Sequence, residues 1–522
     1  MNNIKILWAD DEIDMLKPQL FFLQKKGYEV VTVTNGYDAL EEINTDDTID
    51  IVFLDESMPG LSGLETLEKI KTIRPHLHIV MITKNEAENL MEEAIGSRID
   101  DYLIKPVNPN QILLTLKKTI ENKRIVGNKT VQDYQQSFTA ISMDINSGPD
   151  YKGWVDIYKR LVSWELKMES SFTEDMQAIL SMQKSEANSE FSRYVERNYL
   201  SWMKDDVPED GPDTLSHNLM RNKVFTKMNH DIPTVVLLLD NLRYDQWKAL
   251  EPIFREVFKV KEENFFSSIL PTSTQYSRNA IFAGMTPAEI ARHYPEYWKH
   301  DFEEGGKNNF EDKLLDIQIK RTFRKPISHK YVKITNLQKA KELEMNILNY
   351  LEFDMTVIVY NFIDMLSHAR TEMEVIKELA GDEKAFRSLT RSWFLHSPLW
   401  SALKKVAQKK IQLFVLTDHG TIRVTKPSKV VGDKNTTTNL RYKMGRNLNF
   451  EKKDVFAIDD PVKGGLPAPH MSAKYIFAKE DKYFLYPNNY NYYNNYFKNT
   501  FQHGGISLEE MLCPVVELES KG

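Results

Sequence analysis

The segment IQLFVLTDHGTIRV, residues 411–424, joins a mostly apolar run to a compact polar group. The run over 411–416 is typical of a buried strand. Thr417, Asp418, His419 and Gly420 follow it directly. In open α/β sheets, ligands bind outside the carboxyl ends of the strands. The Asp418–His419 pair therefore indicates a functional site if other strands bring further side chains to the same rim.

Four other segments in the second half of the chain follow the same pattern. They are TVVLLLDNLRYD with Asp240, FFSSILPTSTQYSRNAIFAGMTP with Thr272 and Thr274, MTVIVYNFIDMLSH with Asp364 and His368, and NTFQHGGISLEEMLCPVVEL with His503. Each polar group begins where an apolar run ends. We therefore expect all of them to meet on one rim of one α/β sheet.

Three aspartates and three histidines would then converge. The chain has a single cysteine, Cys513, so a cysteine zinc cluster is excluded. Carboxylates and imidazoles in this ratio suit Zn²⁺ or Mn²⁺. Six ligands suit two ions, which in such sites lie about 3.5–4 Å apart and stabilise the entering and leaving oxygens. A threonine at a helix start beside such an ion is a candidate nucleophile, and Thr272 and Thr274 both fit that place.

These motifs resemble the alkaline phosphatase superfamily, and its PglZ branch most closely, over most of residues 230–520. The resemblance implies that one ion is held by Asp240, Thr274, Asp418 and His419, and the other by Asp364, His368 and His503. It favours Thr274 over Thr272 as the nucleophile, because Thr274 keeps the family's spacing to Gly284. The additional phosphate-binding arginine and third metal site of the monoesterases are not evident, which disfavours a phosphomonoesterase.

The first part of the chain alternates strand-like and helix-like segments, which predicts a doubly wound parallel sheet. Its strand-like segments end in polar residues, namely Asp10, Asp11, Asp55, Thr83 and Lys105. Three carboxylates at one place require a cation, and oxygen ligands of this kind suit Mg²⁺. A lysine and a hydroxyl group nearby would neutralise and hydrogen-bond an incoming phosphoryl group.

This order of DD, LDxxMPG, T and KP motifs resembles the receiver domain of response regulators. The resemblance implies that Asp55 accepts a phosphoryl group from a sensor histidine kinase. It also implies a Mg²⁺ site formed by Asp10, Asp11, Asp55 and the carbonyl group of Ser57, and switch residues Thr83, Tyr102 and Lys105. Trp8 stands where the family more often has valine or isoleucine, and we interpret it as a packing residue.

Residues 123–225 have no clear strand signals. Trp154, Ile157, Leu161, Trp164 and Met168 follow one another at helical spacing, which predicts a helical bundle. We therefore predict three domains: a receiver domain at 1–122, a helical bundle linker at 123–225 and an alkaline-phosphatase-like α/β domain at 226–522. A helix-turn-helix signal or a strongly basic recognition helix is not evident, which disfavours DNA binding as the output.

The net charge of the chain is −7, yet residues 1–122 hold 12 basic against 22 acidic side chains, so the remainder is slightly positive. Residues 421–450 carry seven basic side chains, Arg423, Lys426, Lys429, Lys434, Arg441, Lys443 and Arg446, against Asp433 alone. We expect a basic loop there that attracts a polyanion. The segment YFLYPNNYNYYNNYFKNTF could stack bases. The alternative for each segment is a solvated or packing role. Candidate phosphate contacts are Arg243, Arg278, Arg441 and Lys443.

The chain has no apolar run of membrane-spanning length and no secretory signal at its start, so we expect a cytoplasmic protein without membrane insertion. The order of its parts resembles the PorX-type response regulators, which are associated with type IX secretion and gliding. This resemblance implies a metal-dependent phosphodiesterase acting on oligonucleotide-type phosphodiesters, with phosphorylation promoting a homodimer, and a transcription or secretion-system partner. The alternatives are a non-catalytic regulator whose metal-bound fold is a partner-binding platform, and a phosphomonoesterase.

Overall fold

The computed structural model describes residues 4–75, 77–84, 101–116, 122–169, 174–204, 207–433 and 436–521. The chain divides into two compact units, Met1–Gln136 and Ser137–Gly522. This division falls within the long helix α6 (Asn122–Asn146). In the described part of the chain, no helix is long and apolar enough to cross a membrane.

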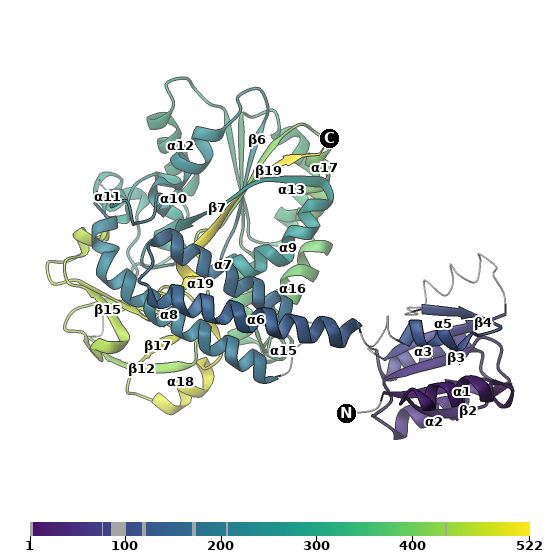
Figure 1. Cartoon of the computed structure of the whole chain (residues 1–522). Coiled ribbons are helices and arrows are strands. Elements are labelled where there is room, and N and C mark those ends of the chain that lie inside the picture. The colour runs from purple at the N-terminus through teal and green to yellow at the C-terminus, as the bar shows by residue number, and fades with distance from the viewer. Residues whose placement is uncertain are drawn as a thin grey trace. The chain divides into compact units, whose positions relative to one another are not determined.

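The first unit, in purple and blue in Figure 1, contains a five-stranded sheet. Its strand order is β2-β1-β3-β4-β5. Its strands are β1 (Lys5–Ala9), β2 (Glu29–Val33), β3 (Ile51–Asp55), β4 (His78–Thr83) and β5 (Asp101–Ile104). All four pairings are parallel, so the predicted doubly wound receiver sheet is confirmed. The strand order reverses between β1 and β3, and the carboxyl ends of these two strands are where a ligand site is expected.

Helices cover both faces of this sheet. Buried residues of α1 (Lys17–Lys25) and α5 (Pro109–Leu116) share one apolar cluster with Trp8 and Phe53. Residues of α2 (Gly36–Thr45) and α3 (Gly63–Ile73) share a second cluster with the opposite side chains of β1 and β3. The Trp8 ring is fully buried and lies 5.3 Å from the Phe53 ring. Trp8 is thus a packing residue, as predicted.

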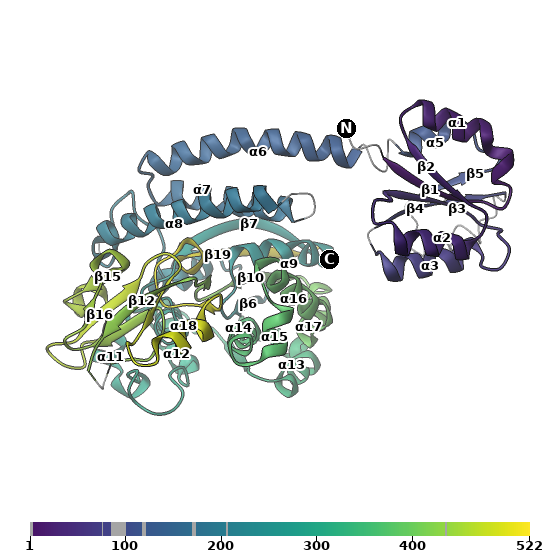
Figure 2. The ribbon, with the colours of Figure 1, turned by 90° about the horizontal axis from the view of Figure 1, so that it is seen from below.

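The predicted spacer is helical, and from Ser137 onward it belongs to the second compact unit. Its helices α7 (Tyr151–Met168) and α8 (Glu174–Trp202) lie side by side in Figure 2. The predicted stripe of α7 is buried, from Trp154 to Met168. Tyr158 packs its ring against Tyr244 of α9 (Tyr244–Val257). The aromatic face of the linker is therefore buried partly against the effector domain.

The effector domain is built on a six-stranded sheet in the order β7-β19-β10-β6-β9-β8. The strands are β6 (Thr234–Leu239), β7 (Phe258–Ser267), β8 (His329–Ile334), β9 (Met355–Tyr360), β10 (Gln412–Leu416) and β19 (Leu512–Ser520). Only β19 runs antiparallel to its neighbours within this sheet. The carboxyl ends of β6, β7, β9 and β10 therefore share one rim, as the sequence predicts.

Helical elements connect these strands. They are the π-helical turn η6 (Thr274–Arg278), α10 (Asn279–Ala283), α11 (Pro287–His293), α12 (Glu311–Thr322), α13 (Leu337–Tyr350), α14 (Phe362–Glu372), α15 (Glu374–Leu379), α16 (Glu383–His396), α17 (Pro398–Ala407) and α19 (Leu508–Met511). Of these, η6 is the next element after β7, and α14 is the next element after β9. These two elements place functional side chains on the rim.

A small β-rich region is inserted between β10 and β19. It contains β11 (Ile422–Arg423), β12 (Lys426–Val431), β13 (Tyr442–Gly445), β14 (Asn449–Phe450), β15 (Val455–Ile458), β16 (Lys474–Ala478), β17 (Lys482–Leu485), α18 (Tyr490–Phe497) and β18 (Phe501–Gln502). Residues 421–450 thus contain strands β11 to β14, and the prediction that they form a loop is wrong. Val430 packs with Ile476 and Phe484 in an apolar cluster, and this packing supports strands there.

Candidate phosphoacceptor and metal sites

The receiver site lies at the carboxyl ends of β1, β3 and β5. Asp10 follows β1, Asp55 is the last residue of β3 and Lys105 follows β5. Lys105 Nζ lies 2.9 Å from Asp10 Oδ2 and 3.1 Å from Asp55 Oδ1. Carboxylate oxygens of Asp10, Asp11 and Asp55 all lie within 4.8 Å of one another. The structure thus brings together the acids and the lysine selected from the sequence.

The electrostatics of this site fit a bound cation. Burial raises the pKa of Asp55 to about 6, opposed by its hydrogen bond with Lys105 and assisted by the nearby charge of Asp10. The positive charge of one lysine is thus too small to offset the burial and mutual repulsion of three carboxylates. A divalent cation with oxygen ligands, such as Mg²⁺, would favour their charged forms. Ser57, whose carbonyl group is the fourth predicted ligand, is exposed and lies two residues beyond β3.

The two other receiver residues lie at neighbouring strand ends. Thr83 ends β4, and its hydroxyl group donates a hydrogen bond to the Glu56 carboxylate. Tyr102 lies on β5 with 41% of its surface exposed. Thr83 already has a partner, so contact with a phosphoryl group at Asp55 would require this hydroxyl to leave Glu56. Glu56 is a partner that the sequence did not reveal.

One group of predicted ligands in the effector domain contains Asp240, Asp418 and His419. Asp240 follows β6 directly, and Asp418 and His419 follow the end of β10. All three residues are buried, and one ligand atom from each lies within 4.8 Å of the others. Thr274 begins η6, and its Oγ1 lies 3.4 Å from Asp240 Oδ1 and 3.2 Å from His419 Nε2. The hydroxyl group of Thr274 therefore faces this group.

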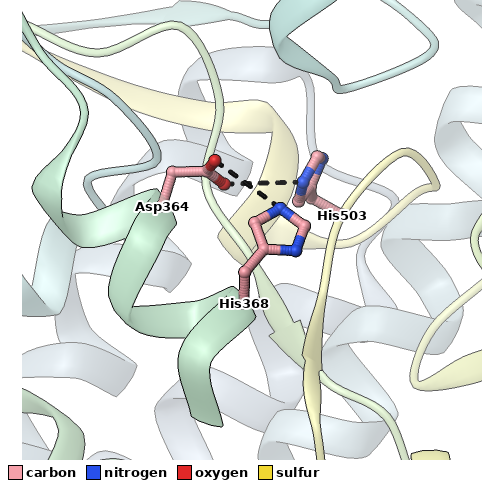
Figure 3. Close-up of side chains that lie close together, drawn as sticks. All are labelled: Asp364, His368 and His503. Carbon is pink, nitrogen blue, oxygen red and sulfur yellow. Dashed lines mark ion pairs between the residues drawn. The ribbon is translucent and has the colours of Figure 1, made fainter. Parts of the chain in front are cut away.

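The second group contains Asp364, His368 and His503. Asp364 and His368 are one helical turn apart on α14, so both side chains lie on one face. His368 Nε2 lies 3.6 Å from Asp364 Oδ2, and His503 Nε2 lies 3.7 Å from Asp364 Oδ1 (Figure 3). The histidines come from α14 and from the loop after β18, and they converge on one carboxylate. This is the grouping that the resemblance implies.

The two groups are adjacent. The rings of His419 and His503 are stacked with their centroids 4.3 Å apart. Asn241 connects the groups, because its backbone N–H donates to Asp418 Oδ1 and its side-chain amide donates to Asp364 Oδ1, both at 3.2 Å. Its φ of 66° lies in the left-handed region, which asparagine tolerates better than most residues. Asn241 is a functional candidate that the sequence analysis missed, although it follows Asp240 directly.

The outer nitrogens of two histidines are fixed by backbone carbonyl groups. His419 Nδ1 donates to the carbonyl oxygen of Gly420 at 3.1 Å, and His503 Nδ1 donates to that of Thr272 at 3.2 Å. A donating Nδ1–H leaves the lone pair of a neutral ring on Nε2, which faces the cluster. Burial lowers the pKa of both rings, so the neutral, metal-binding form is favoured.

The carboxylate of Asp418 lacks sufficient positive charge around it. Burial raises the pKa of Asp418 well above its ordinary value, and the nearby Asp240 adds to this effect. Asp418 Oδ2 is buried and has no hydrogen-bond partner among the described residues. A buried, unpartnered carboxylate oxygen beside a second carboxylate and a neutral imidazole fits a divalent cation, and this donor set suits Zn²⁺ or Mn²⁺.

Thr272 and Thr274 differ in their hydrogen bonds. Thr272 is fully buried, donates to the carbonyl oxygen of Gly505 at 3.0 Å and accepts from the N–H of Gly504 at 3.0 Å. Its hydroxyl group thus holds the loop that carries His503. Thr274 is only partly buried and faces His419. These contacts favour Thr274 as the nucleophile.

Glycines let the backbone pass close to the ligands. A Cβ atom on Gly420 would lie 2.1 Å from the carbonyl oxygen of Glu509, so any side chain there would force the turn after His419 to move. Gly504, directly after His503, has a φ of 120°, which favours glycine. The DHG and HGG motifs thus require glycine for close packing as well as for turn geometry.

The structure does not leave Arg243 and Arg441 free to bind a substrate phosphate. Arg243 is buried and pairs with Asp245 at 2.6 Å and Glu383 at 2.5 Å. Arg441 is fully buried and pairs with Glu510 at 2.6 Å. Their prediction as substrate contacts is therefore wrong, because buried carboxylates already neutralise both guanidinium groups.

Arg278 lies beside the metal ligands, but it supports them from within the core. Its Nη1 lies 2.7 Å from Asp240 Oδ2 and its Nε lies 2.6 Å from Glu311 Oε1. Only 1% of its surface is exposed. This geometry corrects the prediction of a phosphate contact, since the guanidinium group orients Asp240 and offsets part of the negative charge.

Lys443 is also buried, and its Nζ lies 4.6 Å from the centroid of the Tyr486 ring. Burial lowers its pKa from 10.5 to about 7. We predict that Lys443→Met raises the free energy of unfolding at pH 7 by about 1–3 kcal/mol, because a buried charge that has no carboxylate partner among the described residues is removed.

The sign of the pH dependence follows from the lowered pKa of Lys443. The lysine destabilises the fold most below pH 7, and this cost falls between about pH 7 and 10.5, where the unfolded chain also loses the proton. Urea unfolding of both proteins at pH 7 and pH 10 measures the effect. A gain that is equal at the two pH values would contradict the buried-charge explanation.

The exposed members of the basic and tyrosine-rich segments remain candidates for substrate binding. Lys426, Lys429 and Arg446 are exposed, and Lys429 Nζ lies 4.9 Å from the Tyr490 ring centroid. Lys434 lies outside the described residues. On α18, the exposed tyrosines are Tyr492, Tyr493 and Tyr496. The rings of Tyr492 and Tyr496 are stacked at 6.3 Å.

Three family descriptions match consecutive parts of the chain. "Response regulator receiver domain" matches residues 6–117, "PorX response regulator linker domain" matches 124–203, and "BREX system PglZ alkaline phosphatase-like domain" matches 219–518. The fold thus defines a response regulator with an alkaline phosphatase-like effector domain. Because the PglZ match covers more than half of its length, the chain belongs to the PglZ alkaline phosphatase-like family. The three matches together confirm the predicted PorX-type architecture.

Two curated relatives and one solved structure each match about a quarter of the chain. The transcriptional regulatory protein ZraR of Klebsiella oxytoca is 33% identical over 122 residues, which are 23% of this chain and 27% of that protein. The regulatory protein PhoP of Bacillus subtilis is 29% identical over 24% of this chain and 52% of its own length. The chain thus spans less than two thirds of either relative. A receiver domain structure from Clostridium thermocellum is 31% identical, over 24% of this chain and 98% of that chain, with a TM-score of 0.22.

Proposed function

We propose that the chain is a two-component response regulator whose effector domain is a metal-dependent phosphodiesterase. The observation that carries this proposal is the placement of the Thr274 hydroxyl group, 3.2 Å from His419 Nε2, on a rim that holds two adjacent three-residue ligand groups. A partner-binding platform does not require a hydroxyl group at that point. Two divalent ions held by these groups would lower the pKa of a hydroxyl group and neutralise phosphate oxygens.

The protein's own residues would prepare the reaction as follows. Asp240 and His419 orient Thr274 Oγ1, and the side-chain amide of Asn308 donates to the carbonyl oxygen of Thr274 at 2.9 Å, which fixes the start of η6. Oγ1 attacks phosphorus and one alcohol leaves, which gives a phosphothreonine ester. Water then attacks the same phosphorus atom, returns the hydroxyl group to Thr274 and releases the second product as a phosphate monoester.

The neutralised arginines support a diester as the substrate. A monoester carries one more negative charge than a diester at neutral pH, and an additional cation would favour its binding. Arg243, Arg278 and Arg441, the arginines selected from the sequence, all pair with buried carboxylates. The exposed tyrosines of α18 and the exposed lysines of β12 would suit the bases and distal phosphates of an oligonucleotide.

The substrate class can be tested with paired nitrophenyl esters. We expect kcat/KM for bis-p-nitrophenyl phosphate, with Zn²⁺ or Mn²⁺, to exceed that for the monoester by about tenfold or more, since Arg243, Arg278 and Arg441 are already paired with carboxylates and do not compensate the additional charge. A short oligonucleotide should also be cleaved. A preference for the monoester would establish the phosphomonoesterase alternative. No turnover of any ester, with metal content verified, would favour the partner-binding platform.

For regulation, we propose that a sensor histidine kinase phosphorylates Asp55 and that this promotes a homodimer. A chain of buried ion pairs supports a route from the linker to the catalytic rim. Glu165 of α7 lies 2.6 Å from Arg387, which lies 2.7 Å from Asp245, which in turn pairs with Arg243. Arg243 packs against Gly420, where an added Cβ would lie 3.2 Å from its Cγ. A shift of α7 would therefore change the packing of Arg243 against Gly420, next to His419.

We predict that acetyl phosphate with Mg²⁺ changes the dimer fraction and the turnover of the wild type, and that Asp55→Ala abolishes both changes. Asp55 is the acid that accepts the phosphoryl group in this proposal, and removing it leaves no acceptor. Analytical ultracentrifugation and hydrolysis assays measure the two effects. Asp14→Ala is a matched control, because Asp14 is an exposed acid outside the three-carboxylate group. A response that persists in Asp55→Ala would contradict the assignment.

The resemblance to PorX-type regulators also suggests where the output is used. We propose that the product, or the dimer itself, controls a transcription or secretion-system partner in type IX secretion and gliding. A strain that lacks the gene can be complemented with the Thr274→Ala variant to distinguish control by the product from control by the dimer. The variant should fail to restore the function if the product acts, because the product requires turnover, and should restore it if the dimer acts.

A further inference from the structure

A cavity of about 1290 Å³ opens in the effector unit, and none of its lining residues belongs to either metal group. Its walls come from the end of α8, the turns η3 (Ser216–Asn218) and η4 (Met220–Val224), α11, α12 and the segment after η9 (Pro461–Gly464). Gly284, at the end of α10, also lines it. Gly284 and the proposed nucleophile Thr274 lie at the two ends of one helical stretch. At about 1.5 Å per residue, they are about 15 Å apart along it.

Basic side chains dominate the rim of this cavity. Lys204, Arg221, Arg292 and Arg321 line it and are exposed, whereas Glu289 is the one acidic residue among the described residues that line it. Arg321 donates to the carbonyl oxygens of Ala283 and Gly284, and Arg221 contacts the side chain of Asn222 at 3.4 Å. Within the described ranges, none of the four has a carboxylate within ion-pair distance.

One acid offsets only part of these charges. Glu289 accepts hydrogen bonds from the N–H of Thr286 at 2.7 Å and from its hydroxyl group at 2.9 Å, as the capping residue of α11. A second cavity, of about 570 Å³, shows the contrast, because its Arg387 and Lys184 both pair with Glu165. Several cations around one hollow, without ion-pair partners in the part of the chain that the structure describes, repel one another, and a bound anion would relieve this repulsion.

The floor of the cavity is neutral. Met203, Leu466 and Ala291 supply apolar surface, and His217 also lines the cavity. Burial lowers the pKa of His217 to about 4, so the ring is uncharged at neutral pH. Its Nδ1 is buried and has no hydrogen-bond partner in the part of the chain that the structure describes. A base or a sugar hydroxyl group could supply that partner.

We propose that this cavity is a second anion-binding site, for a ligand of nucleotide size that carries two or more phosphates. Arg221, Arg292 and Lys204 would contact the phosphates, and the base would lie on the apolar floor beside His217. Inorganic phosphate would fill a small part of the volume and leave that floor bare. A nucleoside polyphosphate and a short 5′-phosphorylated oligonucleotide share this chemistry, and they are separated by experiment.

The test is equilibrium binding to the full-length chain in EDTA. Without metal ions, the metal groups present Asp240, Asp364 and Asp418 and would repel anions, so binding there does not contribute. Fluorescently labelled ATP and a labelled 5′-phosphorylated tetranucleotide are titrated separately. We expect at least one of them to bind at one site per chain. The ligand with the higher affinity shows whether the cavity binds a nucleoside polyphosphate or a 5′-phosphorylated oligonucleotide.

The variants locate the binding. Arg221→Ala/Arg292→Ala should weaken the affinity by about tenfold or more, and Arg292→Glu should also weaken it, because phosphate contacts are lost. Arg391→Ala, an exposed arginine of α16 outside the cavity, should leave it unchanged. Thermal unfolding checks that each variant is folded. The proposal is overturned if neither ligand binds, if the double variant binds as tightly as the control, or if tripolyphosphate competes as well as the nucleotides. Turnover is not measured, so failure of the proposed phosphodiesterase function would be a separate result.

Discussion

Thr274→Ala is expected to lower the turnover of bis-p-nitrophenyl phosphate by about 10³-fold or more, while the chain stays folded and retains its metal ions. Thr274 Oγ1 is the hydroxyl oxygen that faces both Asp240 and His419, and alanine offers no atom that can attack phosphorus. The aspartate and histidine side chains of the two ligand groups remain in the variant. Hydrolysis assays and metal analysis on the same preparation measure both parts of this expectation.

Two further variants test whether the loss belongs to the nucleophile. Thr274→Ser keeps a hydroxyl group and should retain measurable turnover. Thr272→Ala removes the bonds that join Thr272 to Gly504 and Gly505, and should lower the free energy of unfolding by about 1–3 kcal/mol without removing the nucleophile. Acid quenching during turnover should trap a phosphodiester at residue 274, in which the threonine is linked through phosphorus to the one nitrophenyl group that has not left. If Thr274→Ala were active and Thr272→Ala inactive, the roles of the two threonines would be exchanged.

The rim of the effector sheet was predictable because its signals are local. Asp240 and Asp418 each follow a buried apolar run, and parallel strands bring the ends of such runs together whatever the rest of the fold does. His368 follows Asp364 by one helical turn, so a single helix places both residues. The receiver acids are similar, since Asp10 and Asp55 follow or end adjacent strands.

The roles of the arginines were not predictable in the same way. Whether Arg243 or Arg441 is free depends on partners far away in the sequence, such as Glu383 and Glu510. A basic residue near a motif looks the same in sequence whether it binds substrate or is neutralised in the core. Asn241 was missed for a related reason, because its role depends on the distance between Asp418 and Asp364. Strand β8 was missed because its burial is only partial.

Asp418→Asn is expected to lower turnover by about 10³-fold or more and to reduce the bound metal from two ions to one per chain. Asp418 Oδ2 is a buried oxygen without a hydrogen-bond partner among the described residues, and asparagine keeps the size of the side chain while removing its charge. Asp364, His368 and His503 are unchanged, so the second group should keep its ion. Metal analysis and hydrolysis assays measure the loss.

The stability of this variant should change in opposite directions with and without metal. In EDTA, Asp418→Asn should be as stable as the wild type or more stable, because a buried carboxylate next to Asp240 is removed. With Zn²⁺ the wild type should gain more stability, since metal binding to the folded state contributes to its stability. Asp245→Asn is the matched control: it is equally buried but pairs with Arg243 and Arg387, so it should destabilise the fold under both conditions. Equal destabilisation of Asp418→Asn in EDTA and in Zn²⁺ would mean that Asp418 is structural and that no ion depends on it.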